Sequence, residues 1–220
     1  MNWNQNNAKQ TADSAALLQK INDNWGKFTS IIGRIEDSEV REGAQKLCDD
    51  LHDRLAVCPA STRTDYVGCF TGGLVWHSLN VLKSLKEMRA AFELENTVSS
   101  DSLIVMGLFH DLGKIGNDKN DYYLPQASDW HRNKGMLFEI NDQLLSIPVA
   151  TRSVWWLNQY GIPLSEAEMH AISSLGKSTG ENVSFNPSLK DPWEAYLLQS
   201  AVRGACIRGH GITALPTEAK

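Results

Sequence analysis

Three residues that commonly bind metal ions, His77, His110 and Asp111, fall at positions that face the interior of the predicted helices. His77 lies in the middle of an apolar helix face that begins near residue 73, and His110 follows the apolar Leu103 by one heptad. Asp111 comes at the end of the same helix, where the chain can turn it toward both imidazoles. Two neutral imidazoles and a carboxylate in an apolar interior are costly unless a cation binds them, so the sequence predicts a metal site.

A second interpretation applies to His77 on its own, because a lone buried histidine most often hydrogen-bonds to a backbone carbonyl. The adjacent pair His110-Asp111 shifts the balance toward metal binding. Imidazole ligands favour Mn, Fe, Co, Ni or Zn over calcium, and Mg is kept as an alternative metal. We therefore predict a divalent transition metal as the cofactor.

The elements that must hold these residues are helices. Apolar residues recur every three or four positions near 17–32, 40–55, 73–92 and 100–113. The same spacing predicts helices near 137–144 and 154–161, and further helices from about 165 and from 191, with Ser165 and Glu168 as a capping box. Residues 114–133 lack the pattern, and a loop of this length is usually functional. Strand-like alternation is scarce, so we predict an all-α fold in a single compact bundle.

We expect one helical domain over residues 13–209, between a frayed or disordered N-terminus (1–12) and a C-terminal tail (210–220). The four cysteines form no CxxC pair, which favours reduced thiols. The longest apolar run, 103–109, is far shorter than the roughly 18 residues of a membrane span. The first residues are rich in Asn and Gln and do not have the pattern of a signal peptide. These features predict a soluble, cytoplasmic protein with no membrane partner.

The net charge of the chain limits the classes of ligand that it is expected to bind. The 220 residues have a formal net charge of -5 at pH 7. Tight binding to extended nucleic acid depends on clustered Lys and Arg, so the acidic balance argues against such a partner. A small phosphorylated molecule in a local basic pocket is compatible with it.

The motifs around the predicted metal ligands are familiar. The segment GGLVWHSLNV at 72–81 and the segment HDLGK at 110–114 resemble the HD superfamily of metal-dependent phosphohydrolases. Segments 59–62, 122–125 and 129–131 are similar to HD proteins of tailed phages, and the likeness extends over residues 59–209. The resemblance implies an HD-like helical fold and a metal held by the first His, the His-Asp pair and a late Asp. It also implies hydrolysis of a phosphate ester, commonly in a nucleotide or deoxynucleotide, and the host cytoplasm for a phage-encoded protein.

The chain departs from the family pattern at two late motifs. Where relatives usually have His-Asp-Gly, residues 171–176 read AISSLG with Leu175, and Val202 stands where relatives have the late Asp. Five residues on loops or helix ends are candidates to replace the missing ligand: Asp121, Asp129, His131, His170 and Asp191. Two hypotheses stay open, an active hydrolase and a catalytically degenerate HD fold kept as a binding or structural module. The second includes self-association or a place in a phage assembly.

The remaining candidates would act on the substrate. Asp111 and Lys114 are the predicted catalytic residues, with Lys114 and Arg63 as phosphate contacts. Tyr122, with its neighbour Tyr123, and Trp130 are predicted to stack on a base. The alternatives are that Lys114 compensates a helix dipole and that the aromatic residues anchor their loop. The predicted partner is a nucleotide phosphate.

Overall fold

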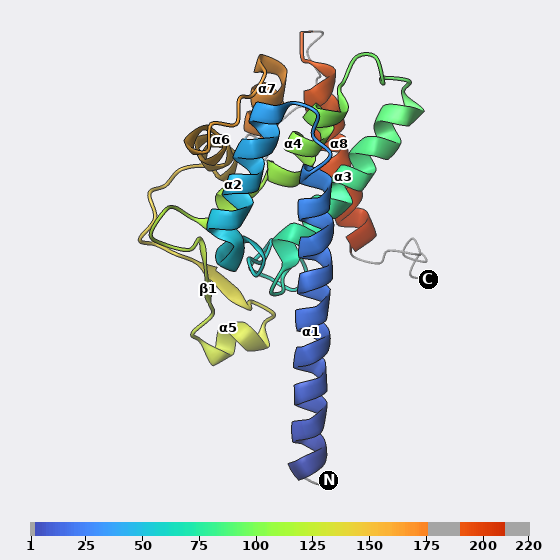
Figure 1. Cartoon of the computed structure of the whole chain (residues 1–220). Coiled ribbons are helices and arrows are strands. Elements are labelled where there is room, and N and C mark those ends of the chain that lie inside the picture. The colour runs from blue at the N-terminus through green and yellow to red at the C-terminus, as the bar shows by residue number, and fades with distance from the viewer. Residues whose placement is uncertain (1–2, 176–189, 210–220) are drawn as a thin grey trace, which may run out of the picture.

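The chain folds as an all-α structure with one small two-stranded sheet, as the computed structural model shows (Figure 1). It describes residues 3–175 and 190–209, with side chains from residue 14 onward. The elements are α1 (Trp3–Ile32), α2 (Ser38–Leu55), α3 (Gly73–Ala91), α4 (Ser100–Phe109), the 3-10 helix η1 (Leu112–Ile115), β1 (Tyr123–Pro125), α5 (Asp129–Asn133), β2 (Phe138–Ile140), α6 (Val149–Gln159), α7 (Glu166–Ser174) and α8 (Trp193–Gly209).

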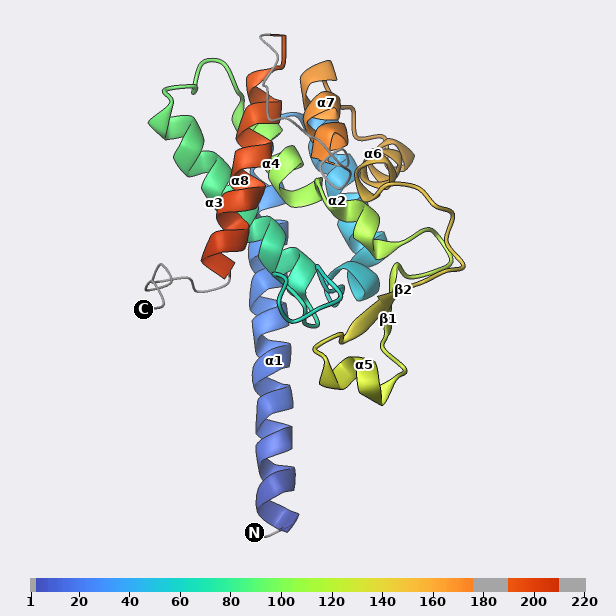
Figure 2. The same cartoon turned by 180° about the vertical axis from the view of Figure 1, so that it is seen from behind.

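Helix α4 forms the centre of the core. Its residues Leu103 to Phe109 are all buried, and a helix that is apolar on every side requires neighbours all round. Figures 1 and 2 show α4 surrounded by other helices, with α3 and α8 packed side by side. The two helices that carry the predicted metal ligands, α3 and α4, are therefore direct neighbours in the core.

Side-chain caps fix where several helices begin. Asp37 accepts hydrogen bonds from the backbone N–H groups at the start of α2, and Ser99 does the same for α4. The predicted capping box of α7 is confirmed, because Ser165 and Glu168 each bond the other's backbone N–H. The starts of these helices follow from local sequence alone.

The prediction of a helix at 137–144 was wrong. Residues 138–140 form β2, which pairs antiparallel with β1 so that Tyr123 lies opposite Ile140. The adjacent backbone N–H of Leu137 donates to Thr62, and that of Asn141 donates to Tyr122. These backbone N–H groups donate to carbonyls of residues distant in the sequence, and not to carbonyls of the same helix. The predicted loop 114–133 also contains structure of its own, namely η1, β1 and α5.

Helix α1 is longer than the sequence analysis expected. It begins at Trp3, so it includes residues for which we predicted a frayed start. No Gly or Pro interrupts the chain before Gly26, which permits a continuous helix. Figure 1 shows its N-terminal half extending away from the rest of the molecule. No helix in residues 3–175 and 190–209 is long and apolar enough to cross a membrane.

Candidate metal centre

The first turn of α3 positions His77. Gly72 precedes the helix with a φ of 84°, a left-handed conformation that glycine adopts without strain. A Cβ on Gly73 would overlap the carbonyl oxygen of Gly68, so the helix start packs directly on the preceding loop. One turn later, His77 is only 4% exposed. The two glycines thus place the imidazole inside the protein.

The end of α4 positions His110. A Cβ on Gly107 would lie 2.9 Å from Cβ of Leu82 and 3.0 Å from its Cα, so this glycine lets α4 approach α3 closely. The carbonyl of Gly107 accepts a hydrogen bond from Nδ1 of His110 at 3.2 Å. Because a carbonyl only accepts, Nδ1 carries the proton in this bond, and Nε2 is the ring nitrogen left to bind a metal. This is the tautomer that metal-ligating histidines commonly adopt.

Asp111 leaves the helix and turns toward the two rings, while α6 holds the turn that follows. The Ser153 hydroxyl accepts the Gly113 N–H at 2.8 Å and lies 2.9 Å from the carbonyl of His110. Nε1 of Trp156 donates to the carbonyl of Gly116 at 2.9 Å. A Cβ on Gly113 would overlap the backbone of α6 at Val149, so the turn sits directly against that helix.

Arg54 on α2 holds the far side of the same turn. Its guanidinium donates to the carbonyls of Ile115 (2.6 Å), Asn117 (2.7 Å) and Asn120 (3.0 Å), and to the carboxylate of Asp121. Carbonyls at the end of a short helix otherwise lack partners. The HDLGK turn is therefore fixed from both sides, by α6 and by α2.

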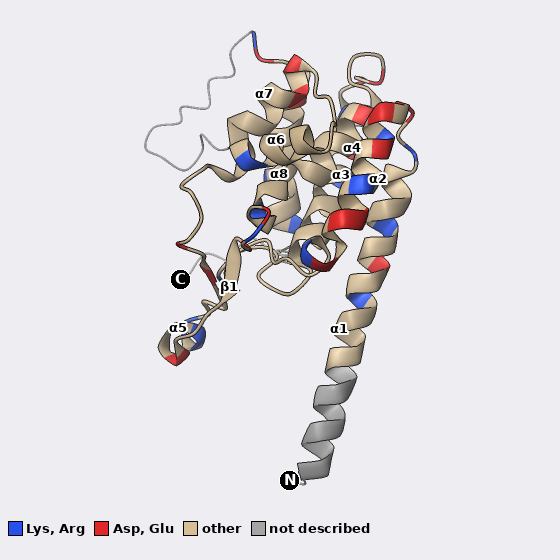
Figure 3. Ribbon diagram, turned by 60° about the vertical axis from the view of Figure 1, so that its left-hand side comes forward, with Lys and Arg blue, Asp and Glu red and all other residues tan. Residues whose placement is uncertain are grey.

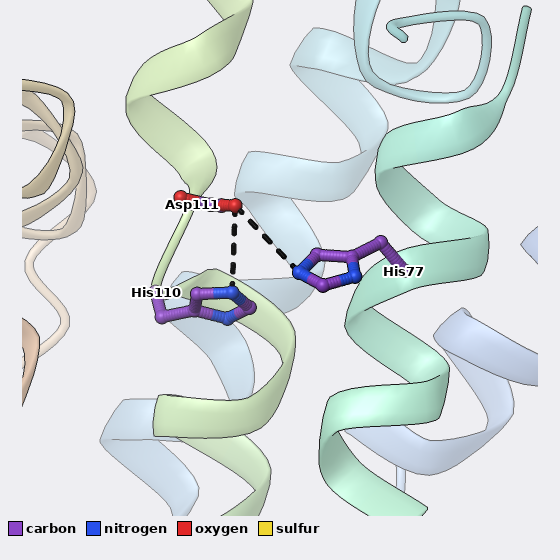
Figure 4. Close-up of side chains that lie close together, drawn as sticks. All are labelled: His77, His110 and Asp111. Carbon is purple, nitrogen blue, oxygen red and sulfur yellow. Dashed lines mark ion pairs between the residues drawn. The ribbon is translucent and has the colours of Figure 1, made fainter. Parts of the chain in front are cut away.

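The three predicted ligands converge, as Figure 4 shows. Oδ2 of Asp111 lies 3.9 Å from Nε2 of His77 and 3.5 Å from Nε2 of His110, and one ligand atom from each residue lies within 4.8 Å of the other two. Within residues 3–175 and 190–209 this is the one group of three or more His, Cys, Asp or Glu side chains with such spacing. The convergence predicted from helical phase is confirmed.

The electrostatics of the group favour the forms that bind cations. Burial, with a smaller effect from the neighbouring His110, lowers the pKa of His77 to about 3, so its ring is neutral. Burial alone would favour the protonated form of Asp111. The charge of Lys114 is the largest effect in the opposite direction, and the pKa of Asp111 lies well below its usual value. A neutral imidazole at His77 and an ionised carboxylate at Asp111 are the protonation states of metal ligands.

A buried ring nitrogen without a hydrogen-bond partner in the described part of the chain also fits a cation site. Nε2 of His110 has a lone pair directed at a carboxylate oxygen, and among the described residues it has no hydrogen-bond donor. A lone pair beside a carboxylate is repulsive, and a shared cation removes the repulsion. The donor set therefore fits a divalent transition metal, whose identity the geometry leaves open.

Lys114 joins the ligand group to a cleft at the surface. Its Nζ donates to Oδ2 of Asp111 at 2.6 Å, and the pair is mostly buried. The same lysine lines a cleft of about 240 Å³ together with Arg54, Tyr122 and Tyr123. Of the predicted substrate contacts, Lys114 and Tyr122 thus meet in one cleft beside the candidate metal site.

The other two predicted substrate contacts lie elsewhere. Arg63 forms a two-pronged ion pair with Asp65 at 2.9 Å, which occupies its guanidinium. Trp130, on the separate short helix α5, is 62% exposed and packs against Lys134 and His131. Neither residue lines the cleft that contains Lys114.

No replacement for the missing late Asp joins the ligand group within the described residues. Asp121 pairs with Arg54, Asp129 pairs with Arg132, and His170 pairs with Asp191 at 3.5 Å. His131 packs on Trp130 of α5. Val202 is half-buried and packs against the apolar core. Leu175 also packs against the core, and Gly176 of the same motif lies outside the described residues.

Sequence reasoning missed two groups around the site, Cys58 and Cys206, and gave Tyr123 a different role. The Cys58 thiol donates to the carbonyl of Lys114 at 3.3 Å, and the Tyr123 hydroxyl donates to the carbonyl of Ala60 at 3.2 Å. Burial raises the pKa of both, and it raises that of Cys206, which lies within electrostatic reach of Asp111. With raised pKa values, these three groups add no negative charge near the carboxylate. Only tertiary packing brings them there.

The chain matches no protein-family model, no curated protein and no solved structure. Its function must therefore be argued from the site itself.

Proposed function

We propose that the protein is a metal-dependent phosphohydrolase that acts on a nucleotide or deoxynucleotide phosphate. The observation that carries the proposal is the convergence of His77, His110 and Asp111 beside a lysine-lined cleft, with His77 neutral and Asp111 ionised. The resemblance of HDLGK and its upstream histidine to the HD superfamily supports the same reaction class.

Each residue has a defined part in this proposal. His77 and His110 bind the metal through nitrogen, and Asp111 binds it through oxygen and neutralises part of its charge. When bound, such a metal supplies a Lewis acid for the phosphoryl group and makes water a nucleophile near neutral pH. Lys114, between Asp111 and the cleft, stabilises negative charge that develops on phosphate oxygens. Tyr122 lines the cleft where the nucleoside part of a substrate would lie.

The test is metal analysis combined with a hydrolysis panel of nucleotides and deoxynucleotides. Protein purified without chelator should contain a transition metal, and Asp111→Asn should lower metal affinity by more than about a hundredfold, since even residues that only support a ligand are worth 10–100-fold. Asp118→Asn, on an exposed loop, is the matched control and should behave like wild type. Absence of metal, of affinity on titration and of turnover would refute the proposal.

A degenerate binding or structural module is the second candidate, and one observation favours it. Lys114 already neutralises Asp111 at 2.6 Å, so the carboxylate has a cationic partner within the protein. Val202 on α8 offers no ligand atom in place of the late Asp. If this candidate is correct, Lys114→Gln should destabilise the fold because it leaves a buried carboxylate unpaired, and metal titration should show no binding.

A further inference from the structure

A strongly basic groove runs between α1 and α3. It is a hollow of about 450 Å³ whose charged side chains are Lys27 from α1, Arg34 from the turn after α1, and Lys83 and Lys86 from α3. No acidic residue lines it. The whole chain carries 26 acidic and 21 basic residues, so this concentration of positive charge runs against the overall balance. Figure 3 shows basic positions along α1 where it packs on the body of the protein.

The cations of the groove are available to a ligand. Within residues 14–175 and 190–209, none of Lys27, Arg34, Lys83 and Lys86 has a carboxylate within ion-pair distance, and all four are exposed. The nearest acid on α3, Glu87, is bound to Arg208. Unpaired like charges that face one hollow repel each other, and an anion in the hollow relieves that repulsion.

The groove continues into a second hollow of about 590 Å³ that shares Lys27, Asn24 and Trp76 with the first. This hollow adds Lys20, and its one acid is Asp23, which accepts a hydrogen bond from Gln19. Lys20 and Lys27 are seven residues apart, which places them on one face of α1 about 10 Å from each other, and Arg34 lies in the turn that follows the helix. Five cations along two connected hollows suit a ligand with repeating negative charges.

Trp76 adds a feature that phosphate binding alone does not need. It lines both hollows, is half-buried and has Phe70 against it, with ring centroids 5.5 Å apart. Aromatic rings beside a basic track are the common means of binding single-stranded nucleic acid, because any base can stack on them. A duplex keeps its base faces covered, and an acidic peptide has no bases.

We propose that the α1–α3 groove binds single-stranded nucleic acid, with phosphates along its lysines and a base against Trp76. This inference does not depend on the proposed hydrolase activity, since neither metal ligands nor Lys114 line the groove. It also explains how an acidic chain holds a polyanion, through local clustering of charge and not through net charge.

The test is fluorescence anisotropy of a labelled 12-residue oligo(dT) with the full chain in EDTA, which separates binding from any metal chemistry. With five cations in contact, affinity should fall about a hundredfold between 50 and 200 mM salt, because single strands give a slope of about 0.7 per phosphate neutralised. The double variant Lys83→Glu/Lys86→Glu should bind at least about twentyfold more weakly at 100 mM salt for the same reason. Lys119→Glu makes the same kind of charge change on an exposed loop and should bind like wild type.

A second variant tests the aromatic contact. Trp76→Leu should weaken binding about tenfold, as loss of one stacked base does, in protein whose circular dichroism shows it to be folded. The proposal is overturned if oligo(dT) does not bind at 50 mM salt, if the double variant binds as tightly as wild type, or if poly-glutamate competes as well as oligo(dT).

Discussion

The close contact of α4 with α3 at Gly107 provides the sharpest test of how the candidate metal centre is built. A methyl group on residue 107 would lie 2.9 Å from Cβ and 3.0 Å from Cα of Leu82, whereas carbon atoms pack at about 3.5–4.0 Å. Since Cα of Leu82 belongs to the backbone, Gly107→Ala must move the two helices apart by about 0.5–1 Å. Metal sites tolerate changes of about 0.2 Å in ligand distance, so the separation exceeds the tolerance severalfold.

Two opposing effects set the stability change. Overpacking a core costs about 1–3 kcal/mol, while replacing a helical glycine by alanine gains about 1 kcal/mol. Gly107→Ala should therefore lower the free energy of unfolding by up to about 2 kcal/mol. Gly26→Ala is the matched control, because its Cβ meets nothing within 4 Å, and it should gain about 1 kcal/mol.

The assays are urea unfolding of both variants and metal titration by calorimetry. We expect Gly107→Ala to bind metal at least about tenfold more weakly than wild type, as loss of support around a site does, and Gly26→Ala to bind like wild type. If Gly107→Ala gained as much stability as Gly26→Ala and kept full metal affinity, close helix approach would not be what forms the site.

Three further predictions follow from the same region. Ser153→Ala should cost about 1–3 kcal/mol in urea unfolding, because the buried N–H of Gly113 loses its acceptor. The metal-free protein should lose stability as pH falls below about 6.5: unfolded His77 takes up a proton there, whereas the folded ring with a pKa of about 3 does not. The slope from this residue is at most about 1.4 kcal/mol per pH unit, and unfolding curves of His77→Leu at pH 6.5 and 4.5 should lack it. Val202→Asp should raise metal affinity in titration if α8 faces the site as the family resemblance implies, and an unchanged affinity would contradict that alignment.

The sequence predicted the all-α class and the convergence of the three ligands, because both depend on helical periodicity. Leu103 and His110 lie one heptad apart, and both side chains are buried, as this spacing predicted for the imidazole. The capping box of α7 was equally local. In each case the pattern that made the prediction lies within about two turns of one helix, although the ligands themselves come from α3 and from the end of α4.

The parts that the sequence did not reveal depend on distant contacts. Residues 138–140 form a strand because β1 and Thr62 supply their hydrogen-bond partners, and no local pattern identifies such partners. Arg63 has the right charge for a phosphate contact, but Asp65 occupies it. The surroundings of Asp111, such as Cys58 and Cys206, likewise come from separate helices and loops.

The clamping of the HDLGK turn from both sides has a consequence for the order in which the protein assembles. Ser153 and Trp156 each lie 40 residues from the glycine that they hold, and Arg54 lies 61 residues from Ile115. Contacts of such long range form late, because the intervening chain must first be ordered. A growing or partly folded chain that lacks α6 therefore has all three ligands but not the turn that aligns them. Metal affinity should appear only when folding is nearly complete, which limits premature capture of an ion by an immature chain.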